Sequence, residues 1–284
     1  MGIKRVGIVG SGIMGSGIAE CAAKAGHEVV LRSRRRETAD AMIAGLEKSL
    51  GKQVEKGKLA EDERAAVLGR VTATSDLGDL SECDLVIESI VEELAPKKHL
   101  FTELDRICAE HAILATNTST LPVIELAMET GRPDKVCGVH FFNPATVMSL
   151  VEIVRPLTAA DSTIAEVRAF AEACGKKPVE VKDQAGFIVN ALLFPYLNNA
   201  VRLLEQGVAT KEDIDEAMKG GCGFPMGPFA LLDLVGLDTS LSILEALYAE
   251  FRDPNYAAMP LLRRMVSAEQ LGRKSGRGFY DYHR

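Results

Sequence analysis

The stretch that decides the fold is "GIVGSGIMGSGIAECAAKAG", residues 7–26. It completes an apolar run, opens a helical pattern, and spaces Gly10, Gly12 and Gly15 as Gly-x-Gly-x-x-Gly. Between a strand and a helix, these glycines allow a tight turn, close approach of a pyrophosphate and close helix–strand packing. The helix N-terminus adds free N–H groups that favour an anion. The stretch therefore predicts a dinucleotide-binding loop that includes Ile13 and Met14, in preference to a plain strand–helix turn.

Around this loop, strand-like apolar runs alternate with helical segments through the first 183 residues. Such alternation, with near-continuous Val, Ile and Leu in the runs, predicts a mostly parallel sheet covered on both faces. The expected fold is α/β, a Rossmann-type doubly wound sheet followed by an all-helical domain. The expected strands are residues 5–10, 28–33, 71–75, 84–89, 112–119, 135–142, 150–155 and 178–182.

The pattern changes near Gly186, which predicts a dinucleotide-binding domain at 1–185 and a helical domain at 186–284. Within the first domain, residues 37–70 are too long for one crossover helix and are interpreted as an arm of two helices joined at "KGK". Breaks at Gly- and Pro-rich segments divide the second domain into several helices. These are expected at residues 187–206, 210–219, 228–251 and 260–271.

Composition excludes several classes of protein. The 284 residues carry a net charge of −7, which argues against broad nucleic-acid binding. No apolar run reaches membrane-spanning length, and a strand begins too near the N-terminus to leave room for a signal peptide. The six cysteines form no Cys-x-x-Cys pair, so reduced thiols are expected, with no disulfide and no metal site. A cytoplasmic protein is the resulting expectation.

The second expected strand ends in "EVVLRSRRRE", residues 28–37. NAD-binding versions of this fold place a carboxylate there, where it accepts hydrogen bonds from the ribose 2′-hydroxyl. This chain instead has neutral Ser33, followed by Arg34 and Arg35, which can bind a phosphate in a bidentate manner. Cations are unfavourable at a helix N-terminus, so their clustering favours a ligand over a solvated surface. NADP is therefore the expected cofactor, with NAD as the alternative.

A histidine and a glutamate are expected to face each other in "GVHFFNPATVMSLVEIV". If residues 136–142 and 149–154 pair as a hairpin, His140 and Glu152 are symmetric about its centre and lie on one face. An imidazole with a carboxylate partner is suited to general acid–base chemistry at neutral pH. A buried His–Glu pair with a purely structural role remains the alternative from spacing alone.

These residues belong to a wider set of motifs that runs through the whole chain. The motifs are "GSGIMGSGIAE", "ESIVEELAPKK", "ATNTSTLP", "HFFNP", "LVEIV", "GFIVNALL", "PMGPFALLDLVGLD" and "GRKSGRGFYDY". With them the chain resembles the 3-hydroxyacyl-CoA dehydrogenases, most closely their short-chain bacterial members. The resemblance implies NAD(P)-dependent interconversion of 3-hydroxybutyryl-CoA and acetoacetyl-CoA, and dimerisation through the helical domain.

The resemblance implies a role for each matching position. His140 corresponds to the catalytic base and Glu152 to its partner, while Ser119 and Asn190 correspond to residues that bind substrate oxygens. The positions that match cofactor contacts are Glu92, Lys97, Asn143 and Lys274. Ser49 and Lys56, on the arm, match positions that meet the CoA moiety. Taken singly, each of these residues could equally be an ordinary turn or surface residue.

The sequence departs from the family pattern at Ser33, where Asp is common, which puts NAD preference in doubt. Three alternatives stay open: longer acyl chains, carrier-protein-bound acyl groups, and a non-catalytic, crystallin-like relative that binds the dinucleotide. The intact His, Glu, Ser and Asn set disfavours the last. The His140 and Glu152 pair with "HFFNP" argues against the 6-phosphogluconate-like dehydrogenases, which use a lysine base. No cysteine has the setting that a sugar-nucleotide dehydrogenase requires.

Overall fold

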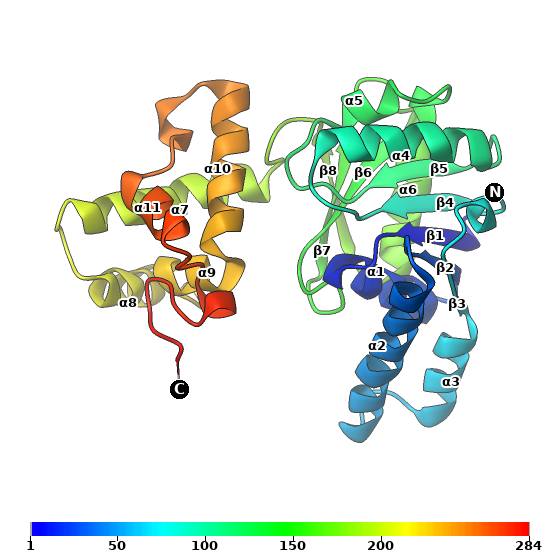
Figure 1. Ribbon diagram of the computed structural model, residues 1–284, viewed down its shortest axis with the longest axis horizontal. Coiled ribbons are helices and arrows are strands. Elements are labelled where there is room, and N and C mark those ends of the chain that lie inside the picture. The colour runs from blue at the N-terminus through cyan, green and yellow to red at the C-terminus, as the bar shows by residue number, and fades with distance from the viewer. Residues whose placement is uncertain (1, 284) are drawn as a thin grey trace. The chain divides into compact units, whose positions relative to one another are not determined.

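The computed structural model describes residues 2–283, and the chain divides into two compact units, Met1–Asp183 and Gln184–Arg284. Figure 1 shows the strands confined to the first unit and the second unit built from helices. The mostly parallel sheet with a helical C-terminal part confirms the predicted fold class.

A single eight-stranded sheet forms the centre of the first unit, in the order β3-β2-β1-β4-β5-β6-β7-β8. Every neighbouring pair is parallel except β6 and β7, which form an antiparallel hairpin. The strands are β1 (Arg5–Val9), β2 (Glu28–Arg32), β3 (Val71–Thr74), β4 (Leu85–Glu88), β5 (Ile113–Thr116), β6 (Val136–Phe141), β7 (Leu150–Arg155) and β8 (Lys177–Lys182).

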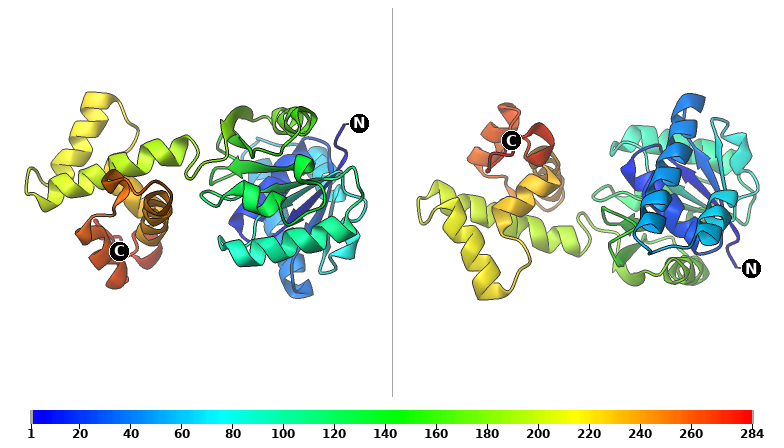
Figure 2. Two further views of the ribbon diagram at one scale, coloured as in Figure 1. Left: turned by 90° about the horizontal axis from the view of Figure 1, so that it is seen from above. Right: turned by 90° about the horizontal axis from the view of Figure 1, so that it is seen from below.

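Helices cover both faces of this sheet (Figure 2). On one face, alternate strand residues such as Ile8, Leu31 and Ile87 pack with α1, α2, α3 and α6 into one core. On the other face, α4 contacts β5 and α5 contacts β6. The helices are α1 (Ile13–Lys24), α2 (Arg36–Glu55), α3 (Glu61–Gly69), α4 (Leu94–Ile107), α5 (Val123–Ala127) and α6 (Asp161–Ala173).

The arm, defined as α2, α3 and the turn between them, extends below the sheet in Figure 1. With 20 residues, α2 is about 30 Å long at a rise of about 1.5 Å per residue. Its buried residues, Ala39, Met42, Leu46 and Leu50, stop before its C-terminal end. Beyond Leu50 the arm packs against the core through partly buried residues, such as Leu59 in the turn after α2.

The second unit contains α7 (Val189–Glu205), α8 (Lys211–Cys222), α9 (Pro228–Val235), α10 (Leu237–Phe251) and α11 (Pro260–Ser267). The expectation of one helix over residues 228–251 was wrong, because Gly236 separates α9 from α10 with φ +101. The last helix ends at Ser267, before residue 271, since Glu269 has φ +57. Across residues 2–283, no helix is both long enough and apolar enough to cross a membrane.

Candidate active site

The glycine loop joins β1 to α1. Gly10 has φ +135, and a Cβ there would lie 2.2 Å from the carbonyl oxygen of Ser89. A Cβ on Gly15 would lie 2.2 Å from the carbonyl oxygen of Gly10. A Cβ on Gly12 would meet no atom within 4 Å, so this glycine faces open space. Gly10 and Gly15 thus allow close packing of the backbone around the loop, and Gly12 leaves room for a ligand at the first turn of α1.

The loop lies where the sheet changes winding direction. From β1 the strand order runs outward through β2 and β3 on one side and through β4 and β5 on the other. Doubly wound sheets bind ligands at this point, beyond the carboxyl ends of the strands. Of the neighbouring residues, Met14 is half-buried and Ile13 is 77% exposed, which presents an apolar side chain beside the loop.

The end of β2 lies directly beside the glycine loop, because the Gly10 amide donates to the Arg32 carbonyl at 3.1 Å. Ser33 is buried, and its amide donates to the Thr74 carbonyl at 3.0 Å. Arg34 and Arg35 follow and are exposed. The position of the expected ribose-binding carboxylate is therefore occupied by a hydroxyl, with two solvent-facing guanidinium groups next in the chain.

His140 and Glu152 are directly opposed on β6 and β7, which confirms the hairpin register predicted from the sequence. His140 Nδ1 lies 2.8 Å from Glu152 Oε2, and both residues are buried. An ionised carboxylate only accepts hydrogen bonds, so Nδ1 carries the proton and Nε2 is left with a lone pair. Ser119 Oγ lies 3.3 Å from that Nε2. The three side chains can move a proton at Nε2 while Glu152 stabilises the imidazolium.

Glu92 organises the loop that carries Ser119. Its Oε1 accepts from Thr118 Oγ1 at 2.6 Å and from the Ser119 amide at 2.7 Å. A longer contact of 3.3 Å comes from the Thr120 amide. Because one carboxylate oxygen holds three consecutive residues, Glu92 fixes the backbone that sets the position of the Ser119 hydroxyl against His140.

Beneath Glu92 lies a buried ion pair, one of whose members the sequence did not single out. Lys97 Nζ is 2.6 Å from Glu88 Oε1, and the two side chains are 1% and 0% exposed. Glu88 also accepts from the Ile90 amide at 2.6 Å and from Thr116 Oγ1 at 2.7 Å. Lys97 reaches Glu92 Oε2 at 3.2 Å. The only sequence signal for Glu88 was an acidic residue closing the apolar strand "DLVIES".

We expect Lys97→Met to lower the free energy of unfolding by about 3–5 kcal/mol, because the substitution leaves the Glu88 carboxylate buried without its counter-ion. Urea unfolding followed by circular dichroism measures the change. Lys98→Met is the matched control, since the adjacent ammonium pairs with Glu125 at 2.8 Å on the surface and should matter little. Equal stability of the two variants would contradict the assigned role of Lys97.

The remaining predicted residues fall outside this group. Asn143 is exposed and follows β6. Ser49 and Lys56 are on the arm, the latter exposed at the C-terminal end of α2. Asn190 and Lys274 belong to the second unit, where Lys274 Nζ lies 2.6 Å from Asp238. Within the first unit, the structure thus brings together the glycine loop, the end of β2, and the cluster around His140.

The six cysteines have free thiols. Burial raises the pKa of Cys83 and of Cys137 to about 12 and that of Cys108 to about 11. These thiols therefore stay protonated at neutral pH and lack the thiolate needed for nucleophilic chemistry. Among the described residues, no group of three or more His, Cys, Asp or Glu side chains could hold a metal ion.

A Rossmann-type unit with a glycine loop and a histidine–glutamate pair defines a nicotinamide dinucleotide-dependent oxidoreductase. Comparison with family models narrows the class. Residues 5–184 match the NAD-binding domain of 3-hydroxyacyl-CoA dehydrogenase, and residues 186–282 match its C-terminal domain. The chain belongs to the 3-hydroxyacyl-CoA dehydrogenase family and is an enzyme of that kind.

Individual relatives match the chain over nearly its full length. The chain is 48% identical to a 3-hydroxybutyryl-CoA dehydrogenase of Clostridioides difficile, covering 99% of this chain and 100% of the relative. It is 44% identical to the human mitochondrial hydroxyacyl-coenzyme A dehydrogenase, and the match covers 99% of this chain and 91% of the relative. Among solved structures, FadB2 of Mycobacterium tuberculosis matches with a TM-score of 0.97, 48% identity and full coverage of both chains.

Proposed function

We propose that the protein interconverts 3-hydroxybutyryl-CoA and acetoacetyl-CoA with NADP(H) as the favoured cofactor. The observation that carries this proposal is the buried His140–Glu152 pair, with Ser119 at His140 Nε2. Relatives at 48–49% identity are named as dehydrogenases of the four-carbon substrate, which supports the same acyl length here.

In this proposal His140 Nε2 takes the proton of the 3-hydroxyl group during oxidation and returns it during reduction. Glu152 keeps Nδ1 protonated and stabilises the imidazolium that forms. Ser119 and Asn190 donate hydrogen bonds to substrate oxygens and orient the reacting carbon. When bound, the dinucleotide supplies the hydride chemistry, and the protein supplies placement and charge.

Residues of the first unit fit a dinucleotide at the places where the fold requires it. Gly10, Gly12 and Gly15, with Ile13 and Met14, would hold the pyrophosphate at the first turn of α1. Glu92 and Asn143 are proposed cofactor contacts from the same unit, and Lys274 is a proposed contact from the second unit. Lys97 belongs to the same set, and its burial between Glu88 and Glu92 supports a contribution made through Glu92.

The preference for NADP rests on the end of β2. Ser33 cannot repel a 2′-phosphate as a carboxylate would, and Arg34 and Arg35 offer exposed guanidinium groups. An NADP-dependent enzyme of this type would mainly reduce acetoacetyl-CoA in cells. A cytoplasmic location and a homodimer formed through the helical unit complete the proposal.

Initial rates of acetoacetyl-CoA reduction with NADPH and with NADH test the proposal directly. We expect kcat/KM to favour NADPH by tenfold or more, a difference of about 1.4 kcal/mol. Equal or better rates with NADH would refute the cofactor preference alone. Turnover of longer or carrier-bound acyl groups, with none of acetoacetyl-CoA, would refute the substrate assignment.

A further inference from the structure

A carboxylate that the proposed reaction does not use lies buried in the helix after the glycine loop. Glu20, on α1, is only 3% exposed. Its Oε1 accepts from Lys24 Nζ at 2.7 Å and from Gln53 Nε2 at 2.8 Å. Its Oε2 accepts from Ser49 Oγ at 2.8 Å. A charge at so buried a position is costly unless it is paired, and here three donors from two helices pair it.

The cluster is closed on itself and ties α1 to α2. Lys24 Nζ also donates to Gln53 Oε1 at 2.6 Å, so Glu20, Lys24 and Gln53 form a ring of hydrogen bonds. Gln53 lies beyond Leu50, the last buried residue of α2. Glu20 therefore holds the arm at a point past the fully buried residues of α2, where polar bonds add to the partial packing of Leu59 against the core.

The same cluster determines which partner receives the proton of the Ser49 hydroxyl. Burial by itself would raise the pKa of the Glu20 carboxyl, but hydrogen bonds from Lys24, Gln53 and Ser49 outweigh it and hold the pKa below its ordinary value. The ionised group can only accept, so Ser49 must donate its single proton to Glu20. Toward other partners Ser49 Oγ is an acceptor, and one of its lone pairs already receives a long hydrogen bond from Gln53 Nε2 at 3.5 Å.

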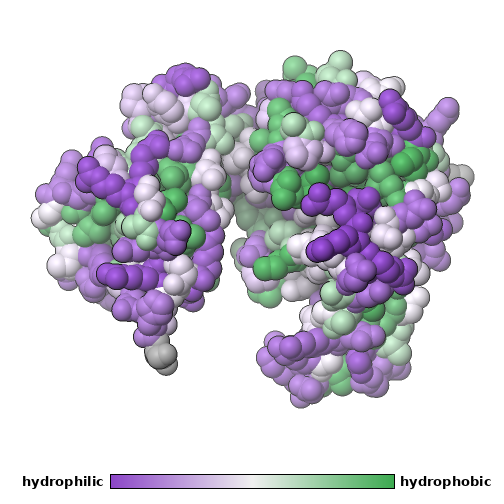
Figure 3. All heavy atoms as spheres, viewed as in Figure 1, coloured by the Kyte–Doolittle hydropathy of each residue, from purple (hydrophilic) through white to green (hydrophobic). Residues whose placement is uncertain are grey.

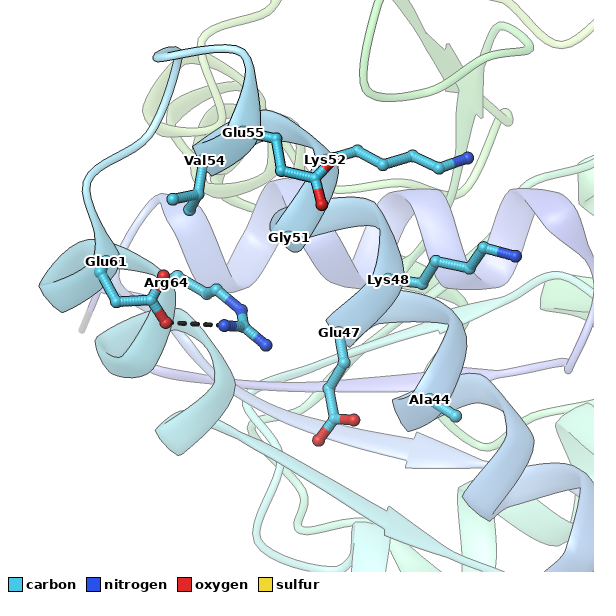
Figure 4. A pocket seen from close by; sticks show the side chains of 9 residues that line it. All are labelled: Ala44, Glu47, Lys48, Gly51, Lys52, Val54, Glu55, Glu61 and Arg64. Atoms are coloured by element: carbon cyan, nitrogen blue, oxygen red, sulfur yellow. Dashed lines mark hydrogen bonds and ion pairs between the residues drawn. The ribbon is translucent and has the colours of Figure 1, made fainter.

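The outer part of α2 is suited to a phosphorylated ligand. Lys52 and Lys56 lie three and seven residues after Ser49, so the three side chains share one side of the helix. Both lysines are exposed. Figure 4 shows Lys52 extending away from Glu61 and Arg64 of α3. Hydrophilic side chains cover much of the arm in the face that Figure 3 presents.

The two sides of the arm differ in character. The side of α2 that faces α3 forms an open groove of about 620 Å³ in which Glu47, Glu55 and Glu61 place acidic groups among basic ones. That mixed groove has no preference for an anion. Lys52 also lines this groove. Together with Ser49 and Lys56, it places two cations beside a hydrogen-bond acceptor along one side of α2, which favours a nucleotide with phosphate and amine or hydroxyl groups.

We propose that Glu20 is a positioning residue for CoA thioesters. It holds the arm so that Ser49, Lys52 and Lys56 meet the nucleotide end of CoA, and it makes Ser49 an acceptor for an N–H or O–H group of that nucleotide. This inference rests on the proposed function, in which the arm meets the CoA moiety. The inference assigns Glu20 a role in substrate binding although it contacts neither the acyl group nor the reacting atoms.

The test compares acetoacetyl-CoA with acetoacetyl-pantetheine, which keeps the acyl thioester and lacks the nucleotide. We expect Glu20→Ala to raise KM for acetoacetyl-CoA about tenfold, the size of one hydrogen bond to a charged group. Its kcat and its kcat/KM for acetoacetyl-pantetheine should stay within twofold of wild type. Glu20→Gln, which can still accept from Ser49, should recover part of the loss.

Two controls separate this role from general damage. Glu61→Ala breaks the ion pair with Arg64 on the same arm, in which the two side chains are 2.6 Å apart. This variant should leave KM and kcat unchanged for both substrates. Should Glu20→Ala fail to fold, Gln53→Ala removes one of the three donors to Glu20. For that variant we expect a smaller increase in KM, and only for acetoacetyl-CoA. A loss shared equally by both substrates, or no loss with either, would overturn the role of Glu20.

The wild-type enzyme distinguishes failure of this inference from failure of the proposed function. If wild type does not reduce acetoacetyl-CoA, the substrate assignment is wrong before any variant is made. If wild type prefers acetoacetyl-CoA to acetoacetyl-pantetheine but the Glu20 variants keep that preference unchanged, the substrate assignment stands and the positioning role is refuted.

Discussion

His140→Gln should lower kcat for acetoacetyl-CoA reduction by at least about 100-fold, because positioned proton transfer contributes about 10²–10⁴-fold. Glutamine is close to histidine in size and can still hydrogen-bond to Glu152, so the hairpin should keep its register. The amide cannot exchange a proton at neutral pH, so the position of His140 no longer supplies a base for the 3-hydroxyl group of the substrate. Steady-state rates at saturating substrate measure the loss.

The fold and the binding of the dinucleotide should survive in this variant. The melting temperature should remain near that of wild type, and quenching of NADPH fluorescence should give a similar Kd. His111→Gln is the matched control, since His111 Nε2 also faces a carboxylate, that of Asp84 at 3.1 Å, but lies on the surface. More than a tenth of wild-type kcat in His140→Gln would contradict the assignment of His140 as the base.

The hairpin shows why part of the site could be predicted from sequence. A strand side chain alternates faces with a period of two, so two residues equidistant from the turn must share a face once the strands pair. His140 and Glu152 satisfy that condition, and the structure pairs them in that register. The glycine loop was equally predictable, because its requirements are local to one strand–helix turn.

Other features depend on contacts that local pattern does not encode. Glu20 and Ser49 are 29 residues apart, and their hydrogen bond depends on the way α2 crosses α1. Glu88 is the last residue of the apolar strand β4, but only the fold brings Thr116 and Lys97 to its two oxygens. The break at Gly236 was missed because apolar residues continue on both sides of it. Helical periodicity alone does not register a single positive φ.

The triple substitution Ser33→Asp, Arg34→Ala and Arg35→Ala should reverse the proposed cofactor preference. The new carboxylate would repel a 2′-phosphate and accept from the 2′-hydroxyl of NAD, while the two charged donors to the phosphate are lost. Each charged hydrogen bond contributes about 1.5–3 kcal/mol, so we expect kcat/KM with NADPH to fall by about 100-fold or more. The value of kcat/KM with NADH should rise or stay the same. Initial rates at subsaturating cofactor provide the comparison.

Arg36→Ala serves as the control for this cluster, because Arg36 Nε already donates to Asp40 at 2.9 Å within α2. If the arginines act only through their summed positive charge, removing Arg36 would weaken NADPH as much as removing Arg34 or Arg35. If they bind the phosphate directly, Arg36→Ala should leave both cofactors nearly unchanged. A triple variant with unaltered NADPH kinetics would mean that Ser33, Arg34 and Arg35 form an ordinary solvated helix start, and that the carboxylate at this position was lost without a change of cofactor.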